Sequence, residues 1–428
     1  MTLGGKTMTV NQPQNKPVSS YESEYMDTLR TLFNESSQIE AIRYFLNTTY
    51  LYFKADNMKK RQPQVIVLGS SIPEELIYAA GAKPFWILGG SLGTVAWSDD
   101  LVPRDTDPVS RSMLGFLLND HFDLGAAALI IVPITCDSSR KMAYLLRAAG
   151  KKVVTVDIPP DKSDPLAGLK WRGQMEQLAE KLADHTGRRL SKKNLVQATQ
   201  LVETARKLMR DFIQVCRQKD GLISGALRMA VLNSYYYTTD LKGWCGHLRK
   251  LNLELLANRQ VISEKEKNKP KVLLMGSPVY LPNYKIPFLI GDIGLQIGAV
   301  LDSSTQKAYA SSGRRKTSKK DTFTAIIETH YRYDCSAAYA QNEMLFQSAR
   351  WHLEQGGIDG VVFHVLKGQI EYDFELERFE QLFGTANIPV FRLETDYQYQ
   401  DVEQLRIRME AFMEMLAHNR YCEEKRAV

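Results

Sequence analysis

The chain has 428 residues, of which 44% are hydrophobic and 24% are charged. A chain of this length and composition predicts a globular protein with more than one domain, because a single hydrophobic core stops growing well below this size. The formal net charge of +6 is modest, and the basic residues are spread along the chain. We therefore expect no nucleic-acid partner, since nucleic-acid-binding proteins concentrate basic residues on one face or segment.

The cysteines are widely spaced and form no CxxC pair; they are Cys136, Cys216, Cys245, Cys335 and Cys422. This odd number and spacing argue against a disulfide framework or a structural zinc site, and favour a reducing cytoplasm. No segment approaches the roughly 20 apolar residues of a membrane helix, and the first 20 residues lack the apolar core of a signal peptide. We expect a cytoplasmic protein with no membrane association.

The first two segments of the chain differ sharply in composition. Residues 1–20 are rich in Gln, Asn, Pro and Ser, which predicts a disordered tail. Over residues 21–61, apolar residues recur at helical spacing and predict a helical N-terminal arm that serves packing or dimerisation.

Residues 62–165 alternate between strand and helix patterns. Strands are predicted at VIVL, PFWIL, AALIIVPI and KKVVTV, with helices after Pro73, from Pro108 and from Ser138. Apolar runs rich in Val, Ile and Leu are typical of parallel strands that are buried on both faces. This alternation predicts a first α/β domain with a doubly wound parallel sheet.

The second half of the chain repeats this order after a helical interruption. Helical periodicity dominates residues 166–269 and predicts a helical linker segment. Beyond Pro270, four segments match the strands of the first domain in order: VLLMGSP, GLQIGAVLD, GIDGVVFHVL and NIPVFRLETD. The repeat predicts a second α/β domain of similar topology at 270–428, which ends in an amphipathic helix. The fold class is therefore α/β, with two doubly wound domains.

Cys136 follows the apolar run AALIIVPI directly and opens the next helix. Open parallel sheets bind ligands just beyond the carboxyl ends of their strands, so this position suits a ligand-facing group. A small side chain buried for packing alone is the alternative. The Gly-Ser turns after Leu68 and Met275 lack both a GxGxxG pattern and a Walker lysine, so we expect no NAD site and no ATP site.

A series of motifs runs in order from about Gln64 to Leu416: IPEELIYAAGAKP, DPVSRSMLG, TCD, YRYDCS, IDGVVFHVLKGQ and IPVFRLETD. Together they resemble the 2-hydroxyacyl-CoA dehydratase family, which includes subunits of the ATP-dependent benzoyl-CoA reductases. The resemblance implies a two-domain subunit with a [4Fe-4S] cluster in its cleft, paired as a homodimer or as a heterodimer with a family paralogue. It also implies an ATP-dependent activator protein that supplies a low-potential electron for radical elimination or reduction of an acyl-CoA thioester.

The cluster positions of this chain depart from the family pattern. The three family cysteines match Asp107, Cys136 and Gln369, so only one thiolate position is kept. Iron–sulfur clusters are held by thiolates, and carboxylate or amide donors are poor replacements. We therefore expect little or no cluster in the isolated chain. If one binds, Cys136 is the expected ligand, with Asp107 or Cys335 completing the site.

Other candidate site residues lie in the same motifs. The resemblance suggests Glu75 as the active-site carboxylate for proton transfer, although an acid in the first turn of a helix also suits the helix dipole. The candidates for substrate binding are Ser70, Ser71, Arg111, Ser112 and Lys367. Asp107 and Arg111, one helical turn apart, are expected to neutralise each other if no metal is bound.

Two functions follow from these patterns. The first is a subunit of a 2-hydroxyacyl-CoA dehydratase-like or acyl-CoA reductase-like system, with Cys136 beside a cleft that Glu75 lines. The second is a catalytically silent family member that acts as a pairing partner, scaffold or small-molecule binding subunit. The loss of two thiolate positions from otherwise preserved segments is the pattern expected for the second function, whereas the first function, a dehydratase-like lyase subunit, is the one that we expect.

Overall fold

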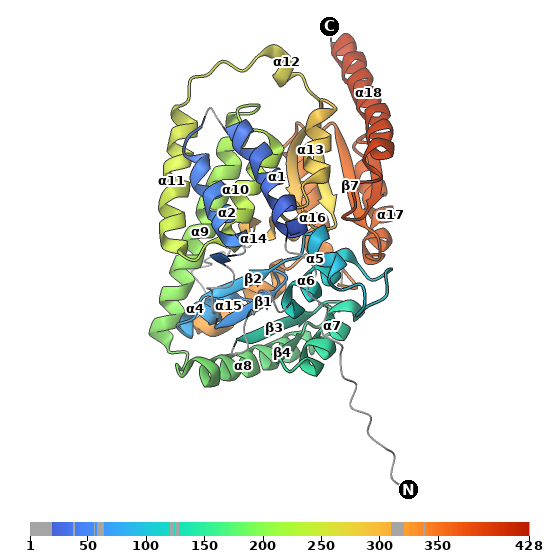
Figure 1. Ribbon diagram of the computed structural model, residues 1–428. Helices are drawn as coiled ribbons and strands as arrows, with labels where there is room; N and C mark the ends of the chain where they lie inside the picture. The colour runs from blue at the N-terminus through green and yellow to red at the C-terminus, as the bar shows by residue number, and fades with distance from the viewer. Residues whose placement is uncertain are drawn as a thin grey trace.

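The structure is a computed structural model that describes residues 19–36, 39–54, 56–57, 64–119, 124, 128–309, 321–336 and 339–427. Most of the predicted N-terminal tail lies outside these residues. Two parallel sheets form the framework, one in the lower half of Figure 1 and the other at its upper right, with long helices on the left.

The first sheet contains β1 (Val65–Leu68), β2 (Pro84–Ile87), β3 (Leu129–Ile134) and β4 (Lys152–Asp157), all parallel, in the order β2-β1-β3-β4. Its helices are α4 (Glu74–Ala79), α5 (Leu92–Ala96), α6 (Pro108–Leu118) and α7 (Asp137–Ala148). Strands β1, β2 and β3 are buried along their whole length, as their uninterrupted apolar sequences require.

The second sheet repeats this arrangement, with β5 (Lys271–Gly276), β6 (Gln296–Leu301), β7 (Gly360–Leu366) and β8 (Val390–Thr395) in the parallel order β6-β5-β7-β8. Its helices are α13 (Lys285–Asp292), α14 (Gln306–Tyr309), α15 (Thr322–Tyr333), α16 (Glu343–Glu354), α17 (Glu371–Gly384) and α18 (Val402–Ala427). The identical strand orders confirm the predicted repeat of two α/β domains with helical termini.

The remaining helices connect the two sheets. They are α8 (Ala167–Thr186), α9 (Lys192–Gln218), α10 (Gly225–Tyr237), α11 (Leu241–Ala257) and α12 (Glu264–Lys267), together with the N-terminal α1 (Ser19–Glu35) and α2 (Ile42–Phe53). Helix α10 contacts both β2 and β6, and α1 and α2 also pack on it. The N-terminal helices thus pack against their own chain. The segment boundaries predicted from the sequence remain predictions.

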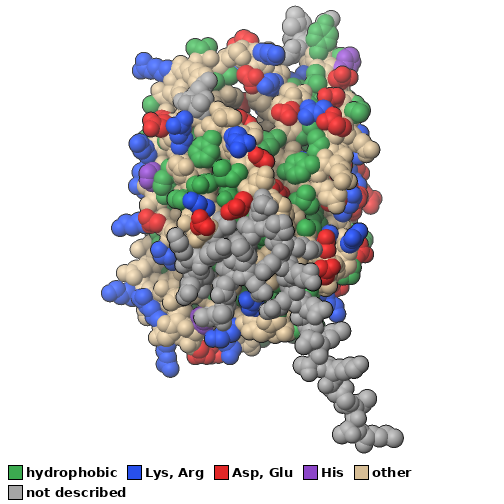
Figure 2. All heavy atoms as spheres, in the orientation of Figure 1, with side chains coloured by type: hydrophobic (Ala, Val, Ile, Leu, Met, Phe, Trp, Pro, Cys, Tyr) green, Lys and Arg blue, Asp and Glu red, His purple; other side chains and the backbone are tan. Residues whose placement is uncertain are grey.

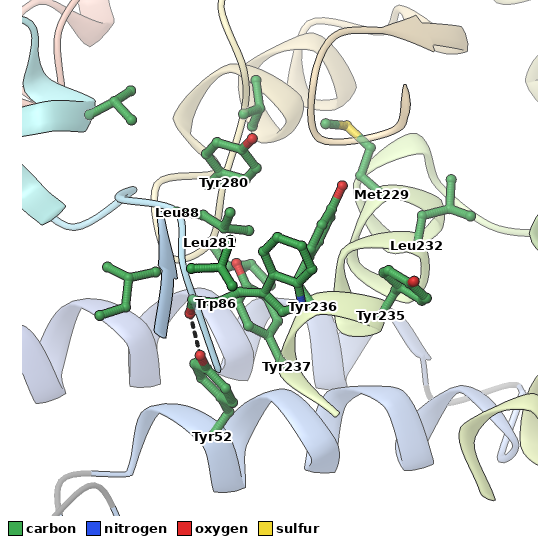
Figure 3. Close-up of a cluster of buried hydrophobic side chains, with 14 of the residues drawn as sticks. Tyr52, Trp86, Leu88, Met229, Leu232, Tyr235, Tyr236, Tyr237, Tyr280 and Leu281 are labelled. Atoms are coloured by element: carbon green, nitrogen blue, oxygen red, sulfur yellow. Dashed lines mark hydrogen bonds between the residues drawn. The ribbon is translucent and has the colours of Figure 1, made fainter. Parts of the chain in front are cut away.

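Aromatic side chains hold α10 between the two domains. Figure 3 shows Tyr236 and Tyr237 in a cluster with Trp86 of β2 and Tyr280 from the segment after β5. The rings of Trp86 and Tyr236 meet edge to face, with centroids 5.4 Å apart. Large buried rings contribute strongly to packing, so this cluster fixes the first domain against the second.

The surface is mixed in character. Figure 2 shows acidic and basic side chains interspersed over one face, with hydrophobic side chains exposed between them. Among the described residues, none of the helices is both long and apolar enough to cross a membrane.

Candidate functional site

The strand order places four connecting segments at matching positions in the two domains. In a sheet of order 2-1-3-4, a crevice opens beyond the carboxyl ends of the first and third strands, where the connections leave toward opposite sides. In the first sheet these segments are 69–71 after β1 and 135–136 after β3. In the second they are 277–278 after β5 and 367–369 after β7.

A cavity of about 140 Å³ lies where these segments meet. Five predicted site residues line it, and they come from both domains: Ser70, Ser71, Asp107, Cys136 and Gln369. The structure therefore brings together Asp107, Cys136 and Gln369, the three positions at which the resemblance implies cluster ligands. We call this space the central cavity.

Asp107 and Gln369 contact each other across the domain boundary. Asp107 begins α6, and its Oδ1 accepts hydrogen bonds from the Ser110 amide at 2.9 Å and from Gln369 Nε2 at 3.3 Å. Both side chains are buried. The side-chain amide oxygen of Gln369, Oε1, is buried and has no hydrogen-bond partner among the described residues, so it can accept from a donor.

Gly368 makes this contact possible. Its φ of +85° lies in the left-handed region, and a Cβ here would approach the carbonyl oxygen of Asp105 to 2.7 Å and the Asp107 amide nitrogen to 3.0 Å. Only glycine adopts this conformation readily and leaves room for the backbone of the other domain.

We expect Gly368→Ala to lower the melting temperature more than Gly187→Ala does. Gly187 also has a positive φ, of +71°, but nothing lies within 4 Å of its added Cβ. The Gly187 variant therefore measures backbone strain alone, about 1 kcal/mol, whereas the Gly368 variant adds a clash between domains. Equal melting temperatures in a thermal unfolding experiment would contradict the close approach.

Cys136 caps α7 and has a protonated thiol at neutral pH. Burial raises the pKa of the thiol above its ordinary value, a hydrogen bond from the Ser139 amide lowers it in part, and the carboxylates of Asp107 and Glu371 raise it further. The Ser139 hydroxyl accepts from the Thr135 and Cys136 amides, at 3.1 and 3.2 Å, which fixes the turn that carries the thiol.

This environment predicts slow alkylation of Cys136 by iodoacetamide at pH 7.5. The rate should rise with pH and not level off until the pH passes the ordinary thiol pKa of about 8.5, since only the thiolate reacts. Asp107→Asn removes one of the two carboxylates, so it should speed the reaction at pH 8. Mass spectrometry of the Cys136 peptide follows the modification. An alkylation rate that levels off below pH 7.5 would contradict a raised pKa of the Cys136 thiol.

The donor set of the central cavity does not fit a cysteine-held iron–sulfur cluster. Asp107 is occupied by the α6 amide and by Gln369, and Gln369 presents an amide. The one thiol faces two carboxylates, which oppose its ionisation. Clusters need thiolates, which cationic or amide-rich surroundings favour. None of the described residues that line this cavity is Lys, Arg or His.

Four other predicted site residues lie outside the described lining of the central cavity. Arg111 forms an ion pair with Asp99, so the expected Asp107–Arg111 pair was wrong; the Asp107 carboxylate instead faces the α6 amides. Ser112 is buried, and its hydroxyl oxygen lies 2.6 Å from that of Thr94. Lys367 is exposed to solvent and pairs with Asp396. Cys335 borders a different, apolar pocket of the second domain.

Glu75, the predicted catalytic carboxylate, lies in a buried ionic cluster away from the central cavity. Its oxygens contact Arg206 Nη1 at 3.1 Å and His330 Nε2 at 2.8 Å. The neighbouring Glu74 contacts Arg206 Nη2 at 3.0 Å and Lys307 Nζ at 2.5 Å. These five side chains, all at most 6% exposed, form what we call the ionic cluster.

The ionic cluster joins four helices. The two glutamates come from α4, Arg206 from α9, Lys307 from α14 and His330 from α15. Burial opposes ionisation of both carboxyls, but the nearby cations outweigh it and keep each pKa below the ordinary value. Burial lowers the pKa of His330, so this imidazole is neutral. Arg206 Nη1 also lies 3.4 Å from the partly exposed Glu203, so three carboxylates surround the cations of Arg206 and Lys307.

Sequence reasoning missed several residues that the structure places at these sites. Ser303, Glu371 and Tyr372 also line the central cavity. Ser303 follows β6, and a strand-end rule applied to every strand would have found it. Arg206 lies on the apolar face of α9, four residues after Val202 and three before Met209, so helical spacing could have marked it as a buried charge, whereas Lys207 lies off that face.

Two further spaces adjoin the central cavity. A groove of about 570 Å³ opens beside it and shares Thr135, Cys136 and Ser336 with its lining. The apolar pocket of the second domain, about 90 Å³, shares Ser303 and Tyr372 with it. Cys136 therefore lies between the wide groove and the central cavity. The apolar pocket borders the central cavity at Ser303 and Tyr372.

These features define an α/β protein with two parallel sheets and a cavity lined by segments from both. The sequence matches the family described as 2-hydroxyglutaryl-CoA dehydratase, D-component, over residues 70–416, and the chain belongs to that family. It is 24% identical to a putative dehydratase subunit, YjiM, of Escherichia coli strain K12, over 81% of this chain and 89% of that protein.

Two further relatives are subunits of named enzymes. The (R)-phenyllactyl-CoA dehydratase beta subunit of Clostridium sporogenes is 22% identical, over 80% of this chain and 89% of that protein. Subunit beta of (R)-2-hydroxyglutaryl-CoA dehydratase of Acidaminococcus fermentans is 20% identical, over 81% of this chain and 90% of that protein.

Proposed function

We propose that this chain is the supporting subunit of an acyl-CoA dehydratase-type system. It binds an acyl-CoA thioester between its domains and pairs with a family paralogue that has all three cluster cysteines. The electron from an ATP-dependent activator enters through that paralogue. The observation that carries the proposal is the hydrogen bond between Asp107 and Gln369, at two positions where the family places cysteines.

The same contact argues against a purely vestigial site. Two buried polar side chains that close onto each other, together with a glycine that permits the approach, form a specific arrangement. Relatives named as beta subunits imply a partner subunit, and their names imply acyl-CoA thioesters. A subunit that keeps the site and loses its thiolates fits a role in holding the thioester.

The spaces around Cys136 suit the parts of an acyl-CoA. The wide groove can accommodate a long coenzyme A arm, and Arg140 and Lys170 line it. The polar central cavity then receives the thioester, and the Ser71 hydroxyl that lines it can donate a hydrogen bond to the thioester carbonyl. Closure of two domains around a ligand excludes water from the site. Radical chemistry on a thioester needs that exclusion.

Co-expression with a cysteine-complete paralogue under anaerobic conditions tests this function. We expect the two chains to elute as one complex in size exclusion, with dehydratase turnover only when both chains and the activator are present. Gly368→Ala should reduce turnover of the complex by disturbing the contact between domains, whereas Gly187→Ala should not. Turnover by this chain and the activator alone would overturn the proposal.

A further inference from the structure

The apolar pocket of the second domain has a composition distinct from that of the central cavity. Apolar and aromatic side chains dominate its lining, among them Met275, Leu301, Leu345, Phe363 and Phe379. All five are at most 6% exposed and belong to the separate hydrophobic core of that domain. A dry apolar space of this kind favours a hydrocarbon group over water.

The pocket is connected to the thioester position by shared residues. Ser303 and Tyr372 line both spaces. The Ser303 carbonyl accepts a hydrogen bond from Ser70 Oγ at 3.2 Å, and Gln306 Nε2 donates to the same hydroxyl at 2.9 Å. The Ser303 carbonyl and the Gln306 amide therefore face Ser70 of the first domain. The rest of the pocket lining is mostly apolar.

The charged groups of the pocket have one sign. Its lining includes the carboxyls of Asp302 and Glu375, and none of its described lining residues is Lys, Arg or His. The Asp302 oxygens accept hydrogen bonds from the amides of Val279, Ser304 and Thr305, so they are already engaged. A further carboxylate brought into this space would lose hydration without gaining a cation from the described lining.

We infer that this pocket, here called the acyl pocket, holds the apolar acyl group of the thioester and rejects acyl groups that end in a carboxylate. This inference rests on the proposed function for the thioester position, and it adds the substrate class. The volume of about 90 Å³ is smaller than the roughly 150 Å³ cavity that holds benzene, so it suits an aliphatic group of about four carbons.

Calorimetric titration of the purified chain with acetyl-CoA, pentanoyl-CoA and glutaryl-CoA tests the inference. Pentanoyl-CoA should bind about tenfold or more tightly than acetyl-CoA, because three further methylenes leave water. Glutaryl-CoA, of the same carbon count as pentanoyl-CoA, should bind at least about tenfold more weakly than pentanoyl-CoA. Equal affinity for all three thioesters would overturn the acyl pocket and leave the thioester site intact.

Helix α16 offers matched variants. Ser348 lines the pocket, whereas Gln347 on the same helix is exposed. Ser348→Leu should fill the space and remove the preference for pentanoyl-CoA over acetyl-CoA, while Gln347→Leu keeps it. Met344 also lines the pocket, so Met344→Ala should enlarge the space and shift the preference toward the longer heptanoyl-CoA. An unchanged chain-length preference in the folded Ser348 variant would overturn the inference.

A truncated probe separates this inference from the proposed function. The N-acetylcysteamine thioester of 4,4,4-trifluorobutanoic acid lacks the coenzyme A arm, and fluorine NMR reports its binding. If this probe binds the wild type and not Ser348→Leu, while the coenzyme A thioesters fail to bind, the acyl pocket stands and the coenzyme A part of the proposed function falls. If neither kind of thioester binds, both are wrong.

Discussion

Arg206→Leu is expected to destabilise the protein by about 3–5 kcal/mol, because the change leaves two buried carboxylates short of a cation. Arg206 is 1% exposed and contacts both Glu74 and Glu75. Removal of one partner from a buried ion pair costs far more than the loss of an exposed pair, whose contribution is about 0–1 kcal/mol. Urea unfolding measures the difference.

Lys207→Leu is the matched control on the same helix. Lys207 is 73% exposed and pairs with Asp211 at 3.5 Å, so we expect a change below about 1 kcal/mol. Adding Glu75→Gln to the Arg206 variant should recover part of the lost stability, because the excess negative charge disappears and Glu74 still pairs with Lys307. If Arg206→Leu and Lys207→Leu lower the free energy of unfolding by the same amount, the ionic cluster does not stabilise the fold as described.

The second large effect is a gain of iron. In the double variant Asp107→Cys with Gln369→Cys, three thiols should converge on the central cavity, because both positions line it beside Cys136. We expect this variant to take up iron and sulfide on anaerobic reconstitution and to absorb broadly near 400 nm. Thiolates at three corners supply the donors that the natural side chains lack.

Cys136→Ala in the same background is the control for this gain. It leaves two of the three thiols, so iron uptake should fall back toward the level of the natural chain. If the double variant stays colourless while its melting temperature is unchanged, the three positions do not converge as the structure places them.

The fold was largely predictable because it follows from local patterns. The apolar runs that became β1, β3, β5 and β7 are buried strands, and their repeated order gave the two matching sheets. The position of Cys136 at a strand end followed from the same pattern. These features need only neighbouring residues, which the sequence displays directly.

The contacts within the sites depend on residues far apart in the chain. Gln369 and Asp107 are 262 positions apart, and their hydrogen bond requires the close approach that Gly368 permits. Glu75 begins a helix, as expected, but its partners come from α9 and α15, and burial with Arg206 separates it from the central cavity. No periodicity in the sequence indicates such partners.

The iron and sulfide content of the natural chain, purified and reconstituted without oxygen, tests the central claim most directly. The claim is that Asp107 and Gln369 close onto each other and leave Cys136 as the only thiol among the described residues that line the central cavity. We expect substoichiometric iron and sulfide and no broad absorption near 400 nm. Cys136→Ala should leave the iron and sulfide content unchanged. A full [4Fe-4S] complement in the natural chain that Cys136→Ala abolishes would contradict the supporting role proposed for this subunit.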